Sequence, residues 1–208
     1  MSIHVETANA PEAGRNLTGA DADLLEALRR GDPATRAAAW ARLGRLAHRV
    51  VGRFFGPGLD PADLVQEVYL RLLPRLDEMK EPEDLRRFVI GTALGVARNQ
   101  ARRARFRRVV GFTVSGDLPE VAVGAADMEA REAVRRFYSV LDDARAEDRS
   151  LFVARLLEKM DMNEIAATHG LSFGTAKRRV ARALERIGRR IESDHLLAEY
   201  LHRDGGWA

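Results

Sequence analysis

Residues 162–180, which read MNEIAATHGLSFGTAKRRV, contain the pattern that decides the fold of this chain. Ile165 and Ala166 belong to a short helical segment that ends at Gly170, a residue type that readily takes the left-handed backbone of a tight turn. Leu171 can fill the angle between two helices, and Ser172 can cap the helix that follows. The short helix, the turn and the longer second helix predict a helix-turn-helix, an arrangement typical of DNA-binding proteins.

The second helix of this pair has one apolar face and one basic face. Ala176 and Val180 face inward in the predicted helix, so the opposite side near its start points to solvent. The outward residues are Thr175, Lys177, Arg178, Arg179 and Arg182. Such side chains can reach base edges and phosphates in a major groove. A solvated basic face on an ordinary helix pair is the alternative, and the turn pattern favours DNA binding over it.

Helix-start signals precede apolar stripes along most of the chain. Asp32-Pro33, Asp60-Pro61 and Glu81-Pro82 each place a residue that can open a helix, and Asp161 with Glu164 forms a capping box. The stripes have the 3–4 spacing of amphipathic helices. They comprise Trp40, Leu43, Ala47, Val50 and Phe54; Leu64, Val65, Val68, Leu72 and Leu76; Leu85, Phe88, Val89, Ala93, Val96 and Ala97; Val134, Phe137, Tyr138 and Leu141; and Ala176, Val180, Ala183, Leu184, Ile187 and Ile191.

These patterns predict an all-α protein with two small helical domains joined by a flexible linker. A four-helix domain is expected at residues 21–108, the glycine-containing linker at 109–127, and a second helical domain at 128–192. Residues 1–20 and 193–208 are expected to form tails, the first of them disordered.

Charge is divided unevenly along the chain, although the net charge is only +3. Residues 98–108 contain six Arg and no acid, and residues 173–190 contain seven basic residues and one acid. Residues 60–84 contain eight acids against three bases. Two basic helices and one acidic segment predict polyanion binding at two places and a different partner at the third.

The residue types that build most catalytic and metal sites are absent or scattered. The chain has no Cys, and its five His form no ligand pattern. We find no nucleotide-binding loop and no catalytic triad, so the sequence predicts neither an enzyme nor a cofactor or metal. The first 20 residues lack the apolar core of a signal peptide, and no apolar run approaches the length of a membrane span, so we expect a soluble cytoplasmic protein.

Two stretches resemble the sigma-70 family of RNA polymerase sigma factors. Residues 160–183 resemble its region four, approximately L-S-x-x-E-I-A-x-x-L-G-I-S-x-G-T-V-K-S-R-L-x-R-A, and response-regulator helix-turn-helix domains share part of this pattern. Residues 60–73, DPADLVQEVYLRLL, resemble the region-two motif D-x-x-D-L-V-Q-E-x-F-L-R-x-x, about 100 residues upstream. This order resembles the small two-domain, extracytoplasmic-function class, and residues 26–33 resemble its opening helix.

The region-two resemblance implies that this helix docks on a coiled coil of the polymerase β′ subunit. Asp63, Gln66, Glu67 and Arg71 recur at 3–4 spacing on one outward face, which suits docking on another helical surface. An ordinary amphipathic helix with surface charges is the alternative, and the order of the two motifs favours docking.

The helix after Leu85 matches the family less closely. One register places Leu85 and Phe88 at the family's aromatic positions and keeps an Arg pair at 102–103, whereas another aligns residues 97–99 with the family's A-R-N. We favour the first because it keeps the Arg pair. The resemblance implies that this helix and the loop at 77–84 grip the −10 promoter element, with one base flipped out and held. The residues expected at this DNA are Arg98, Asn99, Arg102, Arg103 and Arg105.

By resemblance, the partners are core RNA polymerase, contacted at its β′ coiled coil and β flap, and promoter DNA. The C-terminal helix would read the −35 element as duplex. An anti-sigma factor is a further candidate partner, because many members of this class are held by one. One alternative is a helix-turn-helix repressor or activator that binds duplex DNA without polymerase, and the region-two motif argues against it. Another is a sigma-like adaptor or decoy, and the intact basic helices argue against that.

Overall fold

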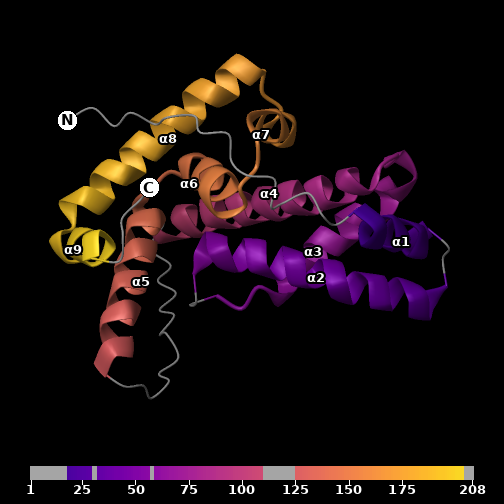
Figure 1. The fold of residues 1–208 in the computed structure, drawn as a ribbon, viewed down its shortest axis with the longest axis horizontal. Helices are drawn as coiled ribbons and strands as arrows, with labels where there is room; N and C mark the ends of the chain where they lie inside the picture. Colours follow the sequence, from indigo (N-terminus) through magenta and orange to yellow (C-terminus); the bar gives the residue numbers. More distant parts are fainter. Residues whose placement is uncertain (1–17, 30–31, 57–58, 110–124, 204–208) are drawn as a thin grey trace.

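The computed structural model describes residues 18–29, 32–56, 59–109 and 125–203, and every regular element in these ranges is helical (Figure 1). The all-α prediction is confirmed. In chain order the elements are α1 (Thr18–Arg29), α2 (Pro33–Phe55), α3 (Ala62–Leu72), the 3₁₀ turn η1 (Leu73–Glu78), α4 (Pro82–Val109), α5 (Ala125–Asp143), α6 (Ala146–Phe152), the π turn η2 (Val153–Leu157), α7 (Met162–His169), α8 (Phe173–Ser193) and α9 (His195–Arg203). We call α1–α4 the N-terminal half and α5–α9 the C-terminal half.

The second helix, α2, begins where the sequence predicts it. The carboxylate of Asp32 accepts a hydrogen bond from the amide of Thr35 at 2.8 Å, and Pro33 occupies the first turn. The inward residues of α2 are Ala39, Leu43, Ala47, Val50, Val51 and Phe54, all of them buried. Trp40 is only partly buried, and its ring packs on that of Tyr69 in α3 with centroids 4.5 Å apart.

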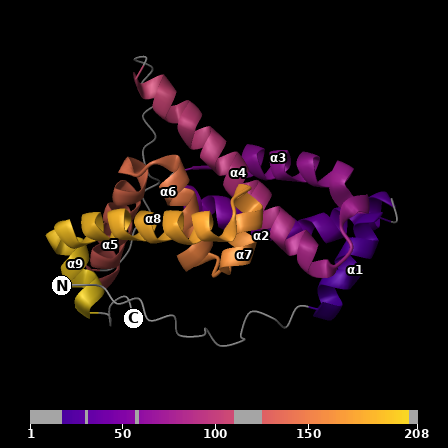
Figure 2. The ribbon, with the colours of Figure 1, turned by 90° about the horizontal axis from the view of Figure 1, so that it is seen from above.

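The longest helix, α4, lies at the centre of the molecule. The carboxylate of Asp84 accepts the amides of Lys80 and Glu81 at 3.2 and 3.1 Å, which fixes the start of the helix. Helices α1, α2 and α3 pack against α4, and so do α6 and α7 from the C-terminal half (Figures 1 and 2). Its buried residues are Leu85, Val89, Ile90, Ala93, Leu94, Val96 and Ala97.

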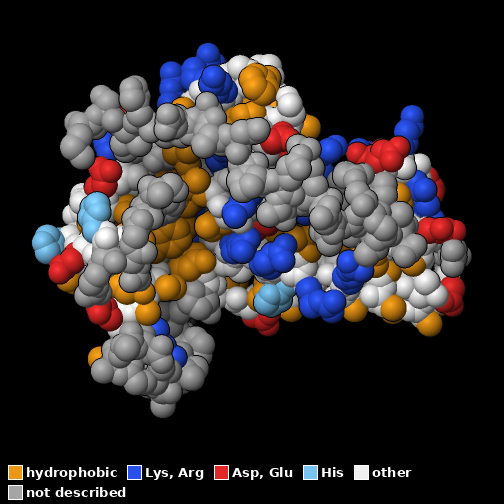
Figure 3. Space-filling model, in the orientation of Figure 1, with side chains coloured by type: hydrophobic (Ala, Val, Ile, Leu, Met, Phe, Trp, Pro, Cys, Tyr) orange, Lys and Arg blue, Asp and Glu red, His pale blue; other side chains and the backbone are white. Residues whose placement is uncertain are grey.

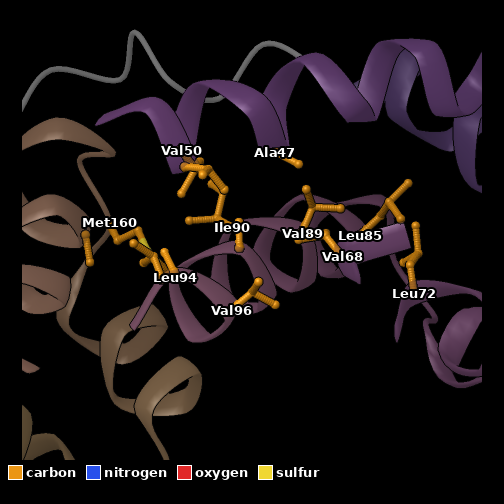
Figure 4. Close-up of a cluster of buried hydrophobic side chains, with 14 of the residues drawn as sticks. Ala47, Val50, Val68, Leu72, Leu85, Val89, Ile90, Leu94, Val96 and Met160 are labelled. Atoms are coloured by element: carbon orange, nitrogen blue, oxygen red, sulfur yellow. The ribbon is translucent and has the colours of Figure 1, made fainter. Parts of the chain in front are cut away.

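One hydrophobic core crosses the boundary between the two halves. It includes Leu94 of α4 and also Met160, Ile165 and Val180 of the C-terminal half. Figure 4 shows Leu94 beside Met160. We call this contact surface the junction: α2 and α4 on one side, and α5, α6, η2 and α7 on the other. The described halves are therefore packed together rather than held apart.

The close approach at the junction depends on two glycines. A Cβ atom on Gly91 of α4 would lie 3.0 Å from the Cγ2 atom of Thr168 in α7. Gly56, with a φ of 77°, lies under the ring of Tyr138 in α5, and a Cβ atom there would come within 2.6 Å of the ring. Any larger residue at Gly56 would therefore strain the backbone and displace Tyr138.

The C-terminal half differs from the sequence predictions in several places. Val134 is exposed and Ala133 is buried in its place, whereas Leu141 is buried as predicted and Phe137 and Tyr138 pack against the same core. The helix predicted from residue 151 begins earlier, at Ala146, and passes into the π turn η2. Residues 195–203 form α9 rather than a tail, because Leu197 is buried in a second core with Leu141, Phe152, Ile187 and Ile191.

The ends of the other predicted segments are partly visible. The N-terminal tail lies outside the described residues except for 18–20, which belong to α1. The linker also lies outside them except at its ends, since α4 extends through Val109 and α5 begins at Ala125.

Candidate nucleic-acid interface

Helices α7 and α8 form the predicted helix-turn-helix. The capping box at the start of α7 is complete: the Asp161 carboxylate accepts the Glu164 amide, and the Glu164 carboxylate accepts the Asp161 amide, both at 2.8 Å. Gly170 ends α7 in the left-handed region at φ 63°, and the Leu171 amide donates to the Ala166 carbonyl at 2.9 Å. This backbone pattern closes a helix and turns the chain sharply, which aims α8 away from α7.

The basic face of α8 is open to solvent. Ala176, Val180, Ala183, Ile187 and Ile191 are buried, so the side predicted to face inward does so. On the opposite side Lys177, Arg178, Arg179 and Arg182 are exposed and Thr175 is partly buried. None of these four cations has an acidic partner among the described residues. Figure 3 shows Lys and Arg side chains gathered over the upper end of α8.

The basic run of α4 is divided between solvent and the C-terminal half. Asn99, Arg103 and Arg105 are exposed. Arg98 and Arg102 instead contact the carboxylate of Glu147 in α6, Arg98 at 3.5 Å and Arg102 at closer range. Two of the residues expected to bind −10 phosphates are therefore already paired with an acid in this structure.

A basic hollow of about 570 Å³ lies where α4, α6 and α8 meet. Arg105 of α4 lines it together with four arginines that the sequence analysis did not single out, namely Arg145, Arg186, Arg189 and Arg190. Two acids, Asp143 and Asp148, also line the hollow, and Asp148 pairs with Arg186 at 2.5 Å. The excess of guanidinium groups suits an anionic group such as a nucleic-acid phosphate. No sequence signal predicts this hollow, since its residues come from α4, the end of α5, the connection to α6, α6 itself and α8.

The segment before α4 is held in place by the first helix. The guanidinium of Arg29 donates to the backbone carbonyls of Leu76 and Met79, and the Leu76 contact measures 3.1 Å. Leu76 and Met79 are themselves buried. The loop expected to help grip the −10 element therefore has a fixed backbone at its start.

The acidic helix α3 presents the predicted docking face. Asp63, Gln66 and Arg71 are exposed, and the partly exposed Glu67 pairs with Arg71 one turn away. Val68 and Leu72 on the other side are fully buried. The sequence analysis missed Leu70, which is 60% exposed. At 100° per residue, Leu70 lies within about 20° of Asp63 around the helix, so it is at the centre of the charged face.

His169, the last residue of α7, lies between the two basic helices. Its Nδ1 atom is 3.0 Å from the carbonyl oxygen of Ile165, and its Nε2 atom is 3.1 Å from the hydroxyl of Ser150. Burial lowers the pKa of His169 below its usual value of 6.5, and the nearby Arg98 and Arg179 lower it further. The two contacts of the imidazole make it a structural link between α6 and α7.

The described residues form an all-α protein with exposed basic side chains on α4 and α8 and a separate charged face on α3, the arrangement that the sequence predicts for a DNA-binding regulator. Within the described residues, no helix is long and apolar enough to cross a membrane. The Sigma-70 region 2 family profile matches residues 39–107. The RNA polymerase sigma-E factor of Streptomyces avermitilis is 31% identical over 151 residues, which cover 70% of this chain and 79% of that protein. The chain belongs to the sigma-70 family, in its extracytoplasmic-function class.

Proposed function

We propose that this chain binds core RNA polymerase and directs it to promoters through the −35 and −10 elements. The observation that supports the proposal is the presence, in a chain of this family, of two helices with exposed basic residues and of a third helix, α3, with an exposed charged face. The basic residues of α8 and α4 suit contacts with DNA, and the charged face of α3 suits contacts with polymerase.

Helix α8 is the proposed reader of the −35 element. Its exposed Lys177, Arg178, Arg179 and Arg182 are not neutralised by acids of the described residues, so they are available to phosphates and base edges. Thr175 stands at its first turn, where Ser172 caps the helix. Side chains at the start of a recognition helix are those that reach base edges.

Helix α4 is the proposed grip on the −10 element. Arg98, Arg102, Arg103 and Arg105 would bind phosphates of the melted strand, and Asn99 is the amide group available for a base edge. The pinned loop before α4 would support a base that has been flipped out of the duplex. A flipped base is available only where the duplex has opened, so its capture would favour the melted strand and promote melting.

Two surfaces are proposed for core polymerase. Asp63, Gln66, Glu67 and Arg71 of α3 surround the apolar Leu70, a charged rim around an apolar centre that suits the β′ coiled coil. In the C-terminal half, Figure 3 shows apolar side chains between α5 and α8. This side of the C-terminal half, where α5 and α8 contribute the partly buried Phe137 and Leu184 to the second core, would receive the β flap.

The proposal is tested by promoter selection followed by transcription with sigma-free core polymerase. The chain should enrich a two-part promoter and support initiation on it. Arg178→Ala and Arg182→Ala should each weaken promoter binding, by about 1–3 kcal/mol where a base edge is lost, without changing polymerase binding. Arg135→Ala on α5, an exposed arginine that does not belong to the basic face of α8, is the matched control. Equal loss of polymerase binding in the α8 variants would contradict the assignment of α8 to DNA.

A further inference from the structure

The carboxylate of Glu147 contacts two arginines of the proposed −10 site on α4. Glu147 is on α6, and its side chain is 37% exposed. One carboxylate oxygen is 3.5 Å from Arg98, whose side chain is only 22% exposed, and the other contacts Arg102. A carboxylate between two guanidinium groups occupies the same donors that a DNA phosphate would use.

The junction holds this carboxylate in position. Thr168 of α7 packs on Gly91 of α4, seven residues before Arg98 in the same helix. On the α2 side, Arg53 donates to the Leu157 carbonyl at 2.6 Å and to the buried Glu158 carboxylate at 3.0 Å. The guanidinium of Arg149 stacks over Phe54 with its carbon 4.8 Å from the ring centroid. Because these contacts are distributed along the interface, α6 cannot withdraw from α4 unless the junction opens.

The docking face on α3 is outside this junction. Asp63, Gln66, Leu70 and Arg71 are exposed while Arg98 and Arg102 are paired. The closed arrangement therefore blocks the proposed −10 contacts of Arg98 and Arg102 and leaves the proposed polymerase-docking face of α3 accessible.

We propose that the C-terminal half is a built-in competitor of the −10 element, in which Glu147 takes the place of DNA phosphates on Arg98 and Arg102. This inference rests on the proposed function of α4. The closed chain docks on polymerase through α3 but does not grip melted DNA. Opening of the junction transfers the two arginines from Glu147 to the promoter.

A reversible disulfide tests the proposal, because the chain has no Cys of its own. The Cβ position at Gly91 is 3.6 Å from the Cβ atom of Thr168, within the range of about 3.5–4.5 Å for a disulfide. The double variant Gly91→Cys/Thr168→Cys should therefore lock the junction when oxidised and release it when reduced. The two single variants are the controls for oxidation alone.

Binding is measured by anisotropy of a fluorescein-labelled, random-sequence single-stranded 20-mer over a series of salt concentrations. The reduced chain should bind more tightly than the oxidised chain. Its log K should also fall more steeply with log salt, by about 1.4, since two phosphate contacts on single-stranded DNA contribute about 0.7 each. Glu147→Gln in the chain without added Cys should tighten binding, whereas Glu132→Gln should not reproduce the effect. Glu132 is the matched control because its side chain is also 37% exposed and also contacts two arginines, Arg135 and Arg136 of α5.

Co-elution with core polymerase distinguishes a failure of the inference about Glu147 from a failure of the proposed function. The proposal expects oxidised and reduced chains to co-elute equally. Equal DNA affinity and equal salt slopes in the two forms, with co-elution retained, would overturn the role of Glu147 and leave the proposed function standing. Absence of co-elution in the parent chain would overturn the proposed function, and the inference with it. Failure of the disulfide to form would show that α4 and α7 do not meet, which also overturns the inference.

Discussion

Truncation of Met160 should destabilise the N-terminal half, although Met160 belongs to the other half. Its side chain is 1% exposed and lies beside Leu94 in the shared core (Figure 4). Removing a buried Met side chain costs about 2–5 kcal/mol, because the lost burial and the cavity left behind add together. With a urea dependence on the order of 2–3 kcal/mol per M for a protein of this size, Met160→Ala should lower the midpoint by about 1 M or more.

Trp40 makes the assay specific to the N-terminal half. It is in α2, packed on Tyr69, and the other tryptophan is removed by using a Trp207→Phe background. Met160→Ala should shift the urea midpoint seen by Trp40 fluorescence to the same extent as the midpoint seen by far-ultraviolet circular dichroism. Met128→Ala is the matched control, because Met128 is 65% exposed on α5 and should change neither midpoint. An unchanged Trp40 midpoint in Met160→Ala would refute the shared core, since it would mean that the two halves unfold independently.

Three further predictions concern single residues. Gly170→Ala should cost about 1–2 kcal/mol of stability in urea unfolding, because the Cβ has open space but the backbone is left-handed, and Gly170→Asn should cost less; equal losses would contradict the turn geometry. The folded chain should lose stability as pH falls below about 6.5, where the unfolded His169 takes up a proton that the folded one resists, so a pH series of unfolding should be flatter in His169→Gln than in the parent. Leu70→Gln should weaken co-elution with core polymerase at an unchanged urea midpoint, because the side chain is exposed; a lowered midpoint would assign Leu70 to packing instead.

The features that the sequence predicts well are local. The turn at Gly170, the capping box at Asp161 and the cap at Asp32 each involve residues within a few positions of one another, so composition and spacing determine them. The stripe of α8 was also predictable, because that helix has a single buried side.

The features that sequence reasoning missed are contacts between distant elements. Ile90 and Leu94 fall outside the predicted stripe of α4, yet both are buried, because α4 packs on two sides rather than one. Because Ile90 and Leu94 are apolar, they were the signal in the sequence that a second side of α4 is buried against a partner. The pairing of Glu147 with Arg98 joins residues 49 positions apart, and no periodicity reports such a contact. Residues 195–203 were too short a stripe to be distinguished from a tail, although Leu197 anchors them.

The most direct test of the account is co-elution of the chain with sigma-free core RNA polymerase on a sizing column, with Glu67→Arg as the disrupting variant. Glu67 pairs with Arg71 on the exposed face of α3, so the substitution reverses the charge of that face without removing a buried group. Glu199→Arg on α9, an exposed acid that also pairs with a residue one turn away, is the matched charge reversal away from α3. The account predicts co-elution that Glu67→Arg weakens and Glu199→Arg does not. Failure of the parent chain to co-elute, with duplex DNA binding retained, would contradict the account and indicate a repressor or activator that acts without polymerase.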